Sequence, residues 1–113
     1  MNRYPKLTAK DAATLKEFLR EVRTALGANV AEIKLFGSKA TGRDQPDSDI
    51  DILVALNHGS VEAEDQVLDI AFNVNLKHDV YISPRVIDCA VLSDPVWRIT
   101  PFLKAIEIEG IRL

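Results

Sequence analysis

Cysteine is almost missing from this chain of 113 residues, in which Cys89 is the only one. A single cysteine excludes a disulfide framework, or a zinc site built on several cysteines, within one chain. Long apolar runs are missing as well, and none approaches the roughly 20 residues that a membrane-spanning helix needs. The first residues are polar and lack the apolar centre of a signal peptide, so we expect a cytoplasmic protein without a membrane partner.

The chain also lacks an excess of basic residues, because 14 Lys and Arg against 17 Asp and Glu leave a net charge of −3. Proteins that bind long nucleic acids usually carry a basic surface, so a DNA or RNA polymer is a disfavoured partner. Repeats, linkers and low-complexity segments are missing too. The composition, 47% hydrophobic and 27% charged, is typical of a globular protein, and we expect one domain over residues 1–113.

Hydrophobic periodicity predicts the order helix, strand, strand, helix, strand, an ambiguous stretch and a final helix. The expected helices cover residues 8–26, 60–77 and 101–110, and the expected strands cover residues 30–36, 49–56 and 79–83. The stretch 86–92 could form a further strand or a short helix. This order indicates an α/β (α+β) fold in which helices pack on a short mixed sheet.

Local signals support these elements. Thr8 and Asp11 resemble a capping box at the start of the first helix, and Pro84 closes the third strand. The strand over 49–56 is almost wholly apolar after its start, as expected for a central strand buried on both faces. The second helix has four large apolar residues on one side: Val61, Leu68, Phe72 and Leu76.

One group of residues indicates a chemically active site. Gly37 and Ser38 directly follow the first strand, and after a further ten residues Asp49 and Asp51 open the buried strand. Because strand side chains alternate, both carboxylates point from the same face and repel each other. A divalent cation removes this conflict, and Mg²⁺ commonly sits on one or two carboxylates plus substrate phosphates. The pair therefore predicts a Mg²⁺–nucleotide or Mg²⁺–phosphate site.

The expected topology adds a third carboxylate. If the first two strands pair antiparallel, Gly37 and Asp49 lie at the same edge of the sheet. A right-handed crossover through the second helix then returns a parallel strand to that edge. Asp79, as the first residue of this strand, is predicted to join Asp49 and Asp51. The alternative for Asp79 is a residue of the helix-to-strand turn.

The loop between the strands supplies candidates for binding phosphate. Gly37 lets the backbone approach a phosphate closely, and Ser38 offers a hydroxyl and an N–H. Lys39 and Arg43 could meet a triphosphate, and Ser48 at the end of the loop belongs to the same predicted group. For Lys39 and Arg43 the alternative is a solvated loop charge.

The spacing of Gly-Ser, ten residues and Asp-x-Asp resembles the signature of the DNA polymerase β nucleotidyltransferase superfamily. The short chain and the wording GSKATG…SDIDILV resemble its minimal nucleotidyltransferases (MNT) over roughly residues 30–113. The resemblance implies that Gly37 and Ser38 hold the β- and γ-phosphates of ATP. It further implies that Asp49 and Asp51 bind two Mg²⁺ ions, and that Asp79 helps bind the catalytic metal and activates the attacking hydroxyl.

The resemblance also implies a reaction and a partner. AMP would pass from ATP to an acceptor, and pyrophosphate would leave. Minimal nucleotidyltransferases are often encoded beside a helical HEPN protein, and they act as antitoxins by attaching AMP to a tyrosine of that ribonuclease toxin. The alternatives are a binding antitoxin or nucleotide-binding module without turnover, and a nucleotidyltransferase that acts on a small molecule such as an antibiotic. The sequence is compatible with a homo-oligomer and with a hetero-oligomer.

Overall fold

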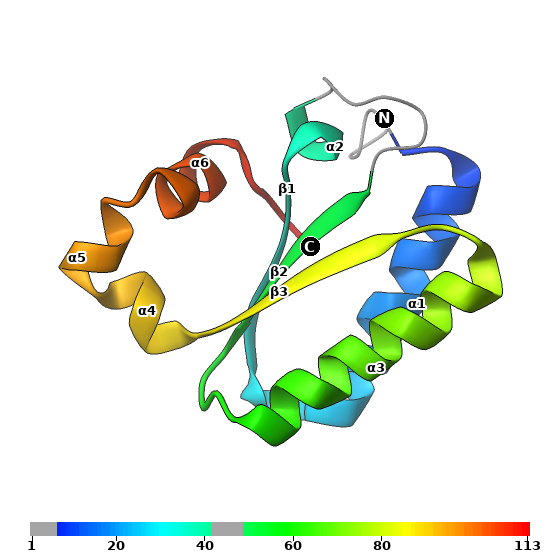
Figure 1. The fold of residues 1–113 in the computed structure, drawn as a ribbon, viewed down its shortest axis with the longest axis horizontal. Helices are drawn as coiled ribbons and strands as arrows, with labels where there is room; N and C mark the ends of the chain where they lie inside the picture. Colours follow the sequence, from blue (N-terminus) through cyan, green and yellow to red (C-terminus); the bar gives the residue numbers. More distant parts are fainter. Residues whose placement is uncertain (1–6, 42–48) are drawn as a thin grey trace.

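A mixed set of helices and strands makes up the computed structural model, which describes residues 7–41 and 49–113 (Figure 1). The helices are α1 (Ala9–Leu26), α2 (Ser38–Thr41), α3 (Val61–His78), α4 (Cys89–Ser93), α5 (Pro95–Arg98) and α6 (Pro101–Glu109), with a short 3-10 turn at Gly27–Asn29. The strands are β1 (Val30–Phe36), β2 (Ile50–Leu56), β3 (Ile82–Asp88) and β4 (Ile111–Arg112). No helix within the described ranges is long and apolar enough to cross a membrane.

Within these ranges the strands form one sheet in the order β3-β2-β1-β4. β1 runs antiparallel to both β2 and β4, whereas β3 runs parallel to β2. The parallel pair follows from the crossover through α3, which carries the chain back to the edge where β2 begins. The predicted mixed sheet and the predicted directions of its first strands are confirmed, and with them the α+β fold class.

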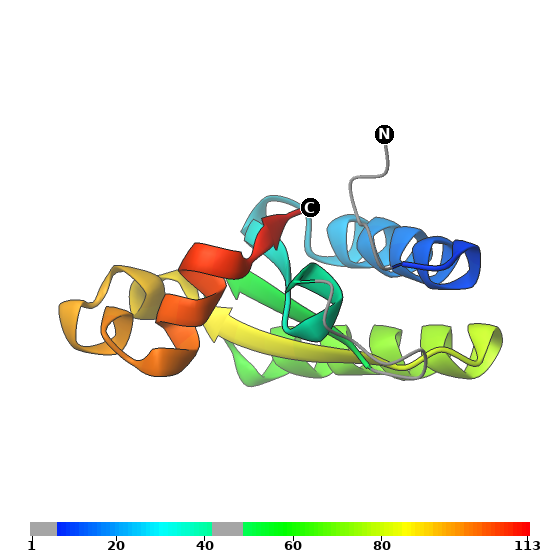
Figure 2. The same ribbon diagram turned by 90° about the horizontal axis from the view of Figure 1, so that it is seen from above.

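The helices cover the two faces of the sheet unequally. Figures 1 and 2 show α1 and α3 together on one side and α4 to α6 gathered on the other. The larger core lies under α1 and α3 and includes Phe18 and Ile52. A smaller cluster joins Leu53 to Leu103 and Ile106 of α6. Because Ile52 and Leu53 are neighbours on β2, alternate residues of this central strand supply the two cores.

Side-chain caps start the long helices where the sequence predicts them. The Thr8 hydroxyl accepts from the Asp11 N–H over 3.0 Å, and the Asp11 carboxylate accepts from the Thr8 N–H over 3.4 Å, which completes the capping box of α1. Ser60 caps α3, and Thr100 caps α6. Gly27 ends α1 with a φ of 51°, a backbone conformation that suits glycine.

Four large apolar residues of α3 face away from the core. Their exposed fractions are 73% for Val61, 43% for Leu68, 63% for Phe72 and 70% for Leu76. The side that packs inward instead carries smaller residues: Ala63, Val67, Ala71 and Val74. Small side chains let the helix axis come close to the sheet and to α1, because little volume separates the backbones. Burial on α3 therefore follows close packing and leaves an apolar surface outside.

The third strand begins later and runs further than predicted. The expected strand covers residues 79–83 and ends at Pro84, whereas β3 spans Ile82–Asp88 and passes through Pro84. A proline is tolerated there because β3 lies at an edge of the sheet, where its missing N–H can face away from the neighbouring strand. The ambiguous stretch divides, since its first residues finish β3 and α4 follows. Sequence reasoning does not find α5 or β4.

Candidate functional site

The predicted carboxylate pair lies at the start of β2. Asp49 directly precedes the strand and is exposed, and Asp51 is its second residue and is half-buried. In the sheet, Asp51 pairs with Phe36 at the end of β1 and with Ser83 on β3. The carboxylate therefore lies at the edge of the sheet where β1 ends and Gly37 begins the next segment.

Gly37 brings the backbone after β1 against the Asp51 carboxylate. Its φ is 75°, in the left-handed region that favours glycine. A Cβ added at Gly37 would overlap Asp51 Oδ2 and would lie 3.2 Å from the Asp51 Cγ. The chain then turns into α2, and the Ala40 N–H donates to the Gly37 carbonyl over 3.1 Å. Contact with Asp51 thus requires glycine here, independently of any phosphate.

Electrostatics at this edge favour a cation. Burial raises the pKa of the Asp51 carboxyl group, the charge of Asp49 raises it further, and the Arg85 guanidinium lowers it. The surroundings therefore disfavour the ionised form of Asp51, and a divalent cation held by both carboxylates would reverse that. Mg²⁺ prefers hard oxygen donors and often takes one or two carboxylates, completing its shell with water and substrate phosphates. The residues present fit Mg²⁺ of this kind.

Asp79 does not join Asp49 and Asp51, in contrast to the prediction. α3 continues to His78, and Asp79 caps it in a left-handed conformation with a φ of 55°. Its side chain is fully exposed, and its Oδ2 lies 3.9 Å from the Lys10 Nζ. In residues 7–41 and 49–113, no group of three or more Asp, Glu, His or Cys side chains is placed to hold a metal ion. The structure therefore does not bring the three predicted carboxylates together, and a catalytic role for Asp79 stays a prediction.

The register of the parallel strands explains this correction. β3 pairs Ile82 with Ile50 and Ser83 with Asp51. The residue beside Asp51 is therefore Ser83, four positions after Asp79. Because the strand starts three residues later than predicted, Asp79 stays in the turn after α3, which is the alternative reading of the sequence.

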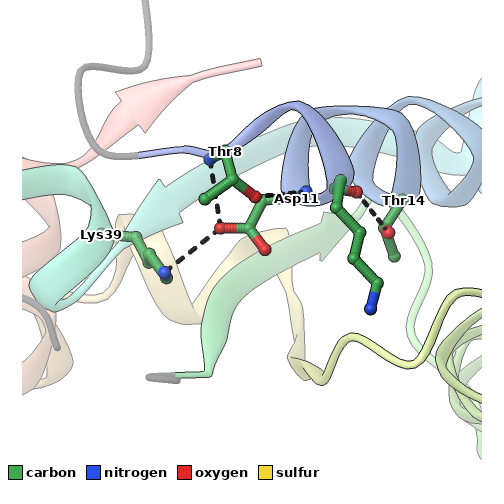
Figure 3. A network of polar contacts seen from close by, with 5 residues as sticks. Thr8, Asp11, Thr14 and Lys39 are labelled. Carbon is green, nitrogen blue, oxygen red and sulfur yellow. Dashed lines mark hydrogen bonds and ion pairs between the residues drawn. The ribbon is translucent and has the colours of Figure 1, made fainter. Parts of the chain in front are cut away.

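Of the four loop residues after Gly37 that are predicted to bind phosphate, the structure describes Ser38 and Lys39. Lys39 is buried, and its Nζ lies 3.2 Å from Asp11 Oδ2. Figure 3 shows this contact as a dashed line. It is therefore not a solvated loop charge, and its ammonium group contacts α1 instead of being presented to a triphosphate. Ser38 begins α2, and its phosphate contact stays a prediction. Arg43 and Ser48 lie outside the described residues, so their contacts with phosphate stay predictions.

Sequence reasoning does not single out Ser83 and Arg85. These residues lie two positions apart on β3, beside Asp51 and Leu53 of β2. The Arg85 guanidinium carbon lies 5.3 Å from the centroid of the Phe102 ring, and the charge of Arg85 lowers the pKa of Asp51. A third strand predicted over residues 82–88 would have placed Ser83 and Arg85 beside β2, next to the carboxylates.

Comparison with known families identifies the class. Residues 15–111 match the model of the nucleotidyltransferase domain family. Because this match covers most of the chain, the chain belongs to that family, and the predicted enzyme class, a nucleotidyltransferase, is confirmed.

The chain also resembles individual proteins in sequence and in structure. A Methanocaldococcus jannaschii protein whose name assigns it as a protein adenylyltransferase is 27% identical over 100 residues, which make up 88% of this chain and 94% of the relative. A crystal structure of a toxin–antitoxin with AMP-PNP has a TM-score of 0.54 at 19% identity and covers 84% of this chain and 68% of its own. A mutant of the toxin–antitoxin MntA–HpeT gives 0.53 at 16% identity, with coverages of 88% and 70%. At such identities the structures show the fold alone, and that fold is the one the sequence predicts.

Proposed function

We propose that this chain transfers AMP from Mg²⁺-bound ATP to a tyrosine of a HEPN-fold ribonuclease toxin and thereby acts as its antitoxin. The observation that carries the proposal is the meeting of Gly37, Asp49 and Asp51 at one edge of the sheet. The relative named for protein adenylyl transfer supports a protein as the acceptor. The similar fold of a toxin–antitoxin crystallised with AMP-PNP supports both an adenine nucleotide and a toxin partner.

Each group at this edge has a proposed task. Asp49 and Asp51 would hold Mg²⁺, as two ions by resemblance to the superfamily, and the metal would neutralise charge on the triphosphate and on the leaving pyrophosphate. Gly37 and Ser38 bind the β- and γ-phosphates through their backbone. The tyrosine oxygen forms a bond to the α-phosphorus as the bond from that phosphorus to the bridging oxygen of pyrophosphate breaks. The hydroxyl proton passes to water, because the described residues place no third carboxylate with Asp49 and Asp51.

An exposed apolar groove beside this edge supports a protein acceptor. Leu68, Phe72, Leu76 and Tyr81 line a hollow of about 450 Å³ between α3 and the start of β3. Exposed apolar surface of this kind commonly marks a protein contact. The Tyr81 carbonyl accepts from the Ile50 N–H over 2.9 Å, so the groove ends beside the residue between the two site carboxylates. A protein bound in the groove therefore reaches the start of β2, the strand that carries Asp49 and Asp51.

Transfer of label tests the proposed reaction. The chain is incubated with Mg²⁺ and ATP labelled at its α-phosphate, together with a HEPN-fold ribonuclease co-expressed with it. The proposal expects label on a tyrosine of the ribonuclease and loss of ribonuclease activity. If no label reaches the protein while Asp49→Ala still neutralises the toxin, the chain works by binding alone. Label that moves to an aminoglycoside in the absence of a protein would support a small-molecule acceptor.

The groove has its own test. Phe72→Ser removes a side chain that is 63% exposed, and Ile108→Ser removes one on α6 that is 79% exposed and serves as the matched control. We expect Phe72→Ser to lower labelling of the ribonuclease by about tenfold, since an apolar anchor is worth on the order of 1–2 kcal/mol in an interface. Binding of Mg²⁺–ATP is expected to be unchanged in both variants. Equal labelling by the two variants would place the acceptor elsewhere.

A further inference from the structure

A buried ion pair joins the first helix to the Gly37–Ser38 turn. Lys39 is 1% exposed and Asp11 is 8% exposed. The Lys39 Nζ donates to Asp11 Oδ2 over 3.2 Å, and the residues are 28 positions apart in the sequence. Figure 3 shows the Lys39 side chain extending from α2 to the first turn of α1. The pair therefore bridges two elements that meet only through tertiary packing.

Asp11 is held in place from the other side. Its carboxylate oxygen that contacts Lys39 also accepts from the Thr8 N–H over 3.4 Å, and its own N–H donates to the Thr8 hydroxyl over 3.0 Å. Thr14, one turn further along α1, is buried as well and donates its hydroxyl to the Lys10 carbonyl over 2.7 Å. The anion that meets Lys39 is thus fixed by a helix that packs on the core.

Burial of an ion pair contributes little net stability, because the cost of removing both charges from water offsets their attraction. A buried pair does, however, favour one arrangement, since any shift that separates the charges gives up their attraction without returning either charge to water. Lys39 directly follows Ser38, and Gly37 lies against the Asp51 carboxylate. An arrangement favoured at Lys39 is therefore transmitted by the backbone to the turn that faces Asp51.

We propose that the Lys39–Asp11 pair is a positioning device that anchors the Gly37–Ser38 turn to α1 and so holds that turn against Asp51. Lys39 is then a positioning residue, in place of the phosphate ligand that its position beside Ser38 suggests. Asp11, which the sequence presents as a helix cap, has the second task of receiving this lysine. This inference rests on the proposed role of the turn in nucleotide binding.

Four variants separate positioning from its alternatives. Lys39→Met removes the cation at nearly constant length, and Asp11→Asn removes the anion but keeps an oxygen that can accept from the Thr8 N–H. Lys39→Arg keeps the charge and serves as the conservative rescue. Ser60→Ala is the matched control, because it weakens a helix cap, that of α3, without touching Asp11 or Lys39. All are compared at a temperature at which circular dichroism shows each variant to be folded.

Two measurements are made on each variant: the Kd for Mg²⁺–ATP and amide hydrogen exchange over residues 37–41. Positioning predicts that Lys39→Met and Asp11→Asn weaken Mg²⁺–ATP binding by a similar factor, on the order of tenfold, and that the double variant is no worse than either single one. It also predicts faster exchange over 37–41 in both. Lys39→Arg and Ser60→Ala are expected to remain near the wild type in both measurements.

The other outcomes overturn the proposal in distinct ways. Weaker ATP binding in Lys39→Met with unchanged binding in Asp11→Asn would make Lys39 a phosphate ligand. Lower melting temperatures with unchanged ATP binding and unchanged exchange over residues 37–41 would make the pair structural only. A wild-type chain that binds no Mg²⁺–ATP would contradict the proposed function, while faster exchange in both variants would still support the anchoring of the turn.

Discussion

The acidic residues at the start of β2 and those along the α1–α3 side of the molecule have opposite surroundings. Asp51 lies half-buried beside Asp49, and burial together with that like charge raises its pKa. On the α1–α3 side, Glu17 lies 2.9 Å from the Lys77 Nζ and 3.2 Å from the His78 ring, and its pKa is lowered to about 2. Two further acids of that side also have lysine partners: Asp11 with Lys39, and Asp79 with Lys10.

This difference separates structural acids from the candidate catalytic ones. An acid whose charge is balanced by a lysine of the same chain does not need a metal, whereas a half-buried carboxylate whose pKa is raised by an adjacent carboxylate does. Asp79 belongs to the first kind and Asp51 to the second, although both precede or begin strands that run parallel in one sheet. The environment of a carboxylate therefore identifies the metal site better than its position next to a strand.

The largest expected effect comes from exchanging the two kinds of acid for amides. Asp51→Asn is expected to lower AMP transfer by about 100-fold or more, because it removes a carboxylate that holds the metal at the reacting phosphates. Asp79→Asn is its matched control and should stay within about twofold of the wild type, since asparagine tolerates the left-handed conformation at this position. The rate of labelling from α-labelled ATP measures the effect of each substitution. An equal loss of rate in the two variants would contradict the distinction between Asp51 and Asp79.

A second pair of variants sharpens the geometry around Asp51. Gly37→Ala and Gly27→Ala both place a side chain at a positive φ, at 75° and 51°, and each should cost about 1–3 kcal/mol of stability from strain. Only the Cβ at Gly37 meets Asp51, because nothing lies within 4 Å of one at Gly27. We expect Gly37→Ala to reduce transfer by about 10- to 100-fold, and Gly27→Ala to leave the rate per folded molecule unchanged. Similar rates in both would contradict the contact.

The smallest expected effect concerns Glu17 and stability. Hydrogen bonds from Lys77 and His78 lower the pKa of Glu17 from 4.5 to about 2. The stabilisation from this acid is therefore fully present above pH 4.5 and is lost as the pH falls through about 2. Glu17→Gln should melt slightly below the wild type at pH 6, and the difference should shrink as the pH is lowered from 4.5 toward 2. Thermal unfolding followed by circular dichroism checks this, and a difference that grows in acid would contradict the ion pair.

Local patterns in the sequence predict much of the fold. The alternation over 30–36, the apolar run that β2 forms and the caps at Thr8, Ser60 and Thr100 are all confirmed, because each depends on residues close together in the chain. The place of Asp49 and Asp51 at the start of β2 is predicted for the same reason. Their metal-binding role stays a prediction.

The misplaced features depend on contacts between distant segments. The strand beside β2 begins at Ile82 and not at Asp79, because pairing with Ile50 sets its register. On α3, close packing selects Ala63 and Ala71 for the core over larger residues such as Phe72. Lys39 is buried because its partner, Asp11, comes from a helix 28 positions earlier. Composition and periodicity do not contain this information.

The assignment of the metal site to Asp49 and Asp51 is tested most directly by the Mg²⁺-dependent affinity for ATP. This affinity is determined by calorimetric titration of the wild type, Asp51→Asn and Asp79→Asn. We expect the wild type and Asp79→Asn to bind ATP tightly only when Mg²⁺ is present, and Asp51→Asn to lose that dependence on Mg²⁺. Mg²⁺-dependent binding that survives in Asp51→Asn but is lost in Asp79→Asn would contradict the assignment of the metal to the Asp49–Asp51 edge.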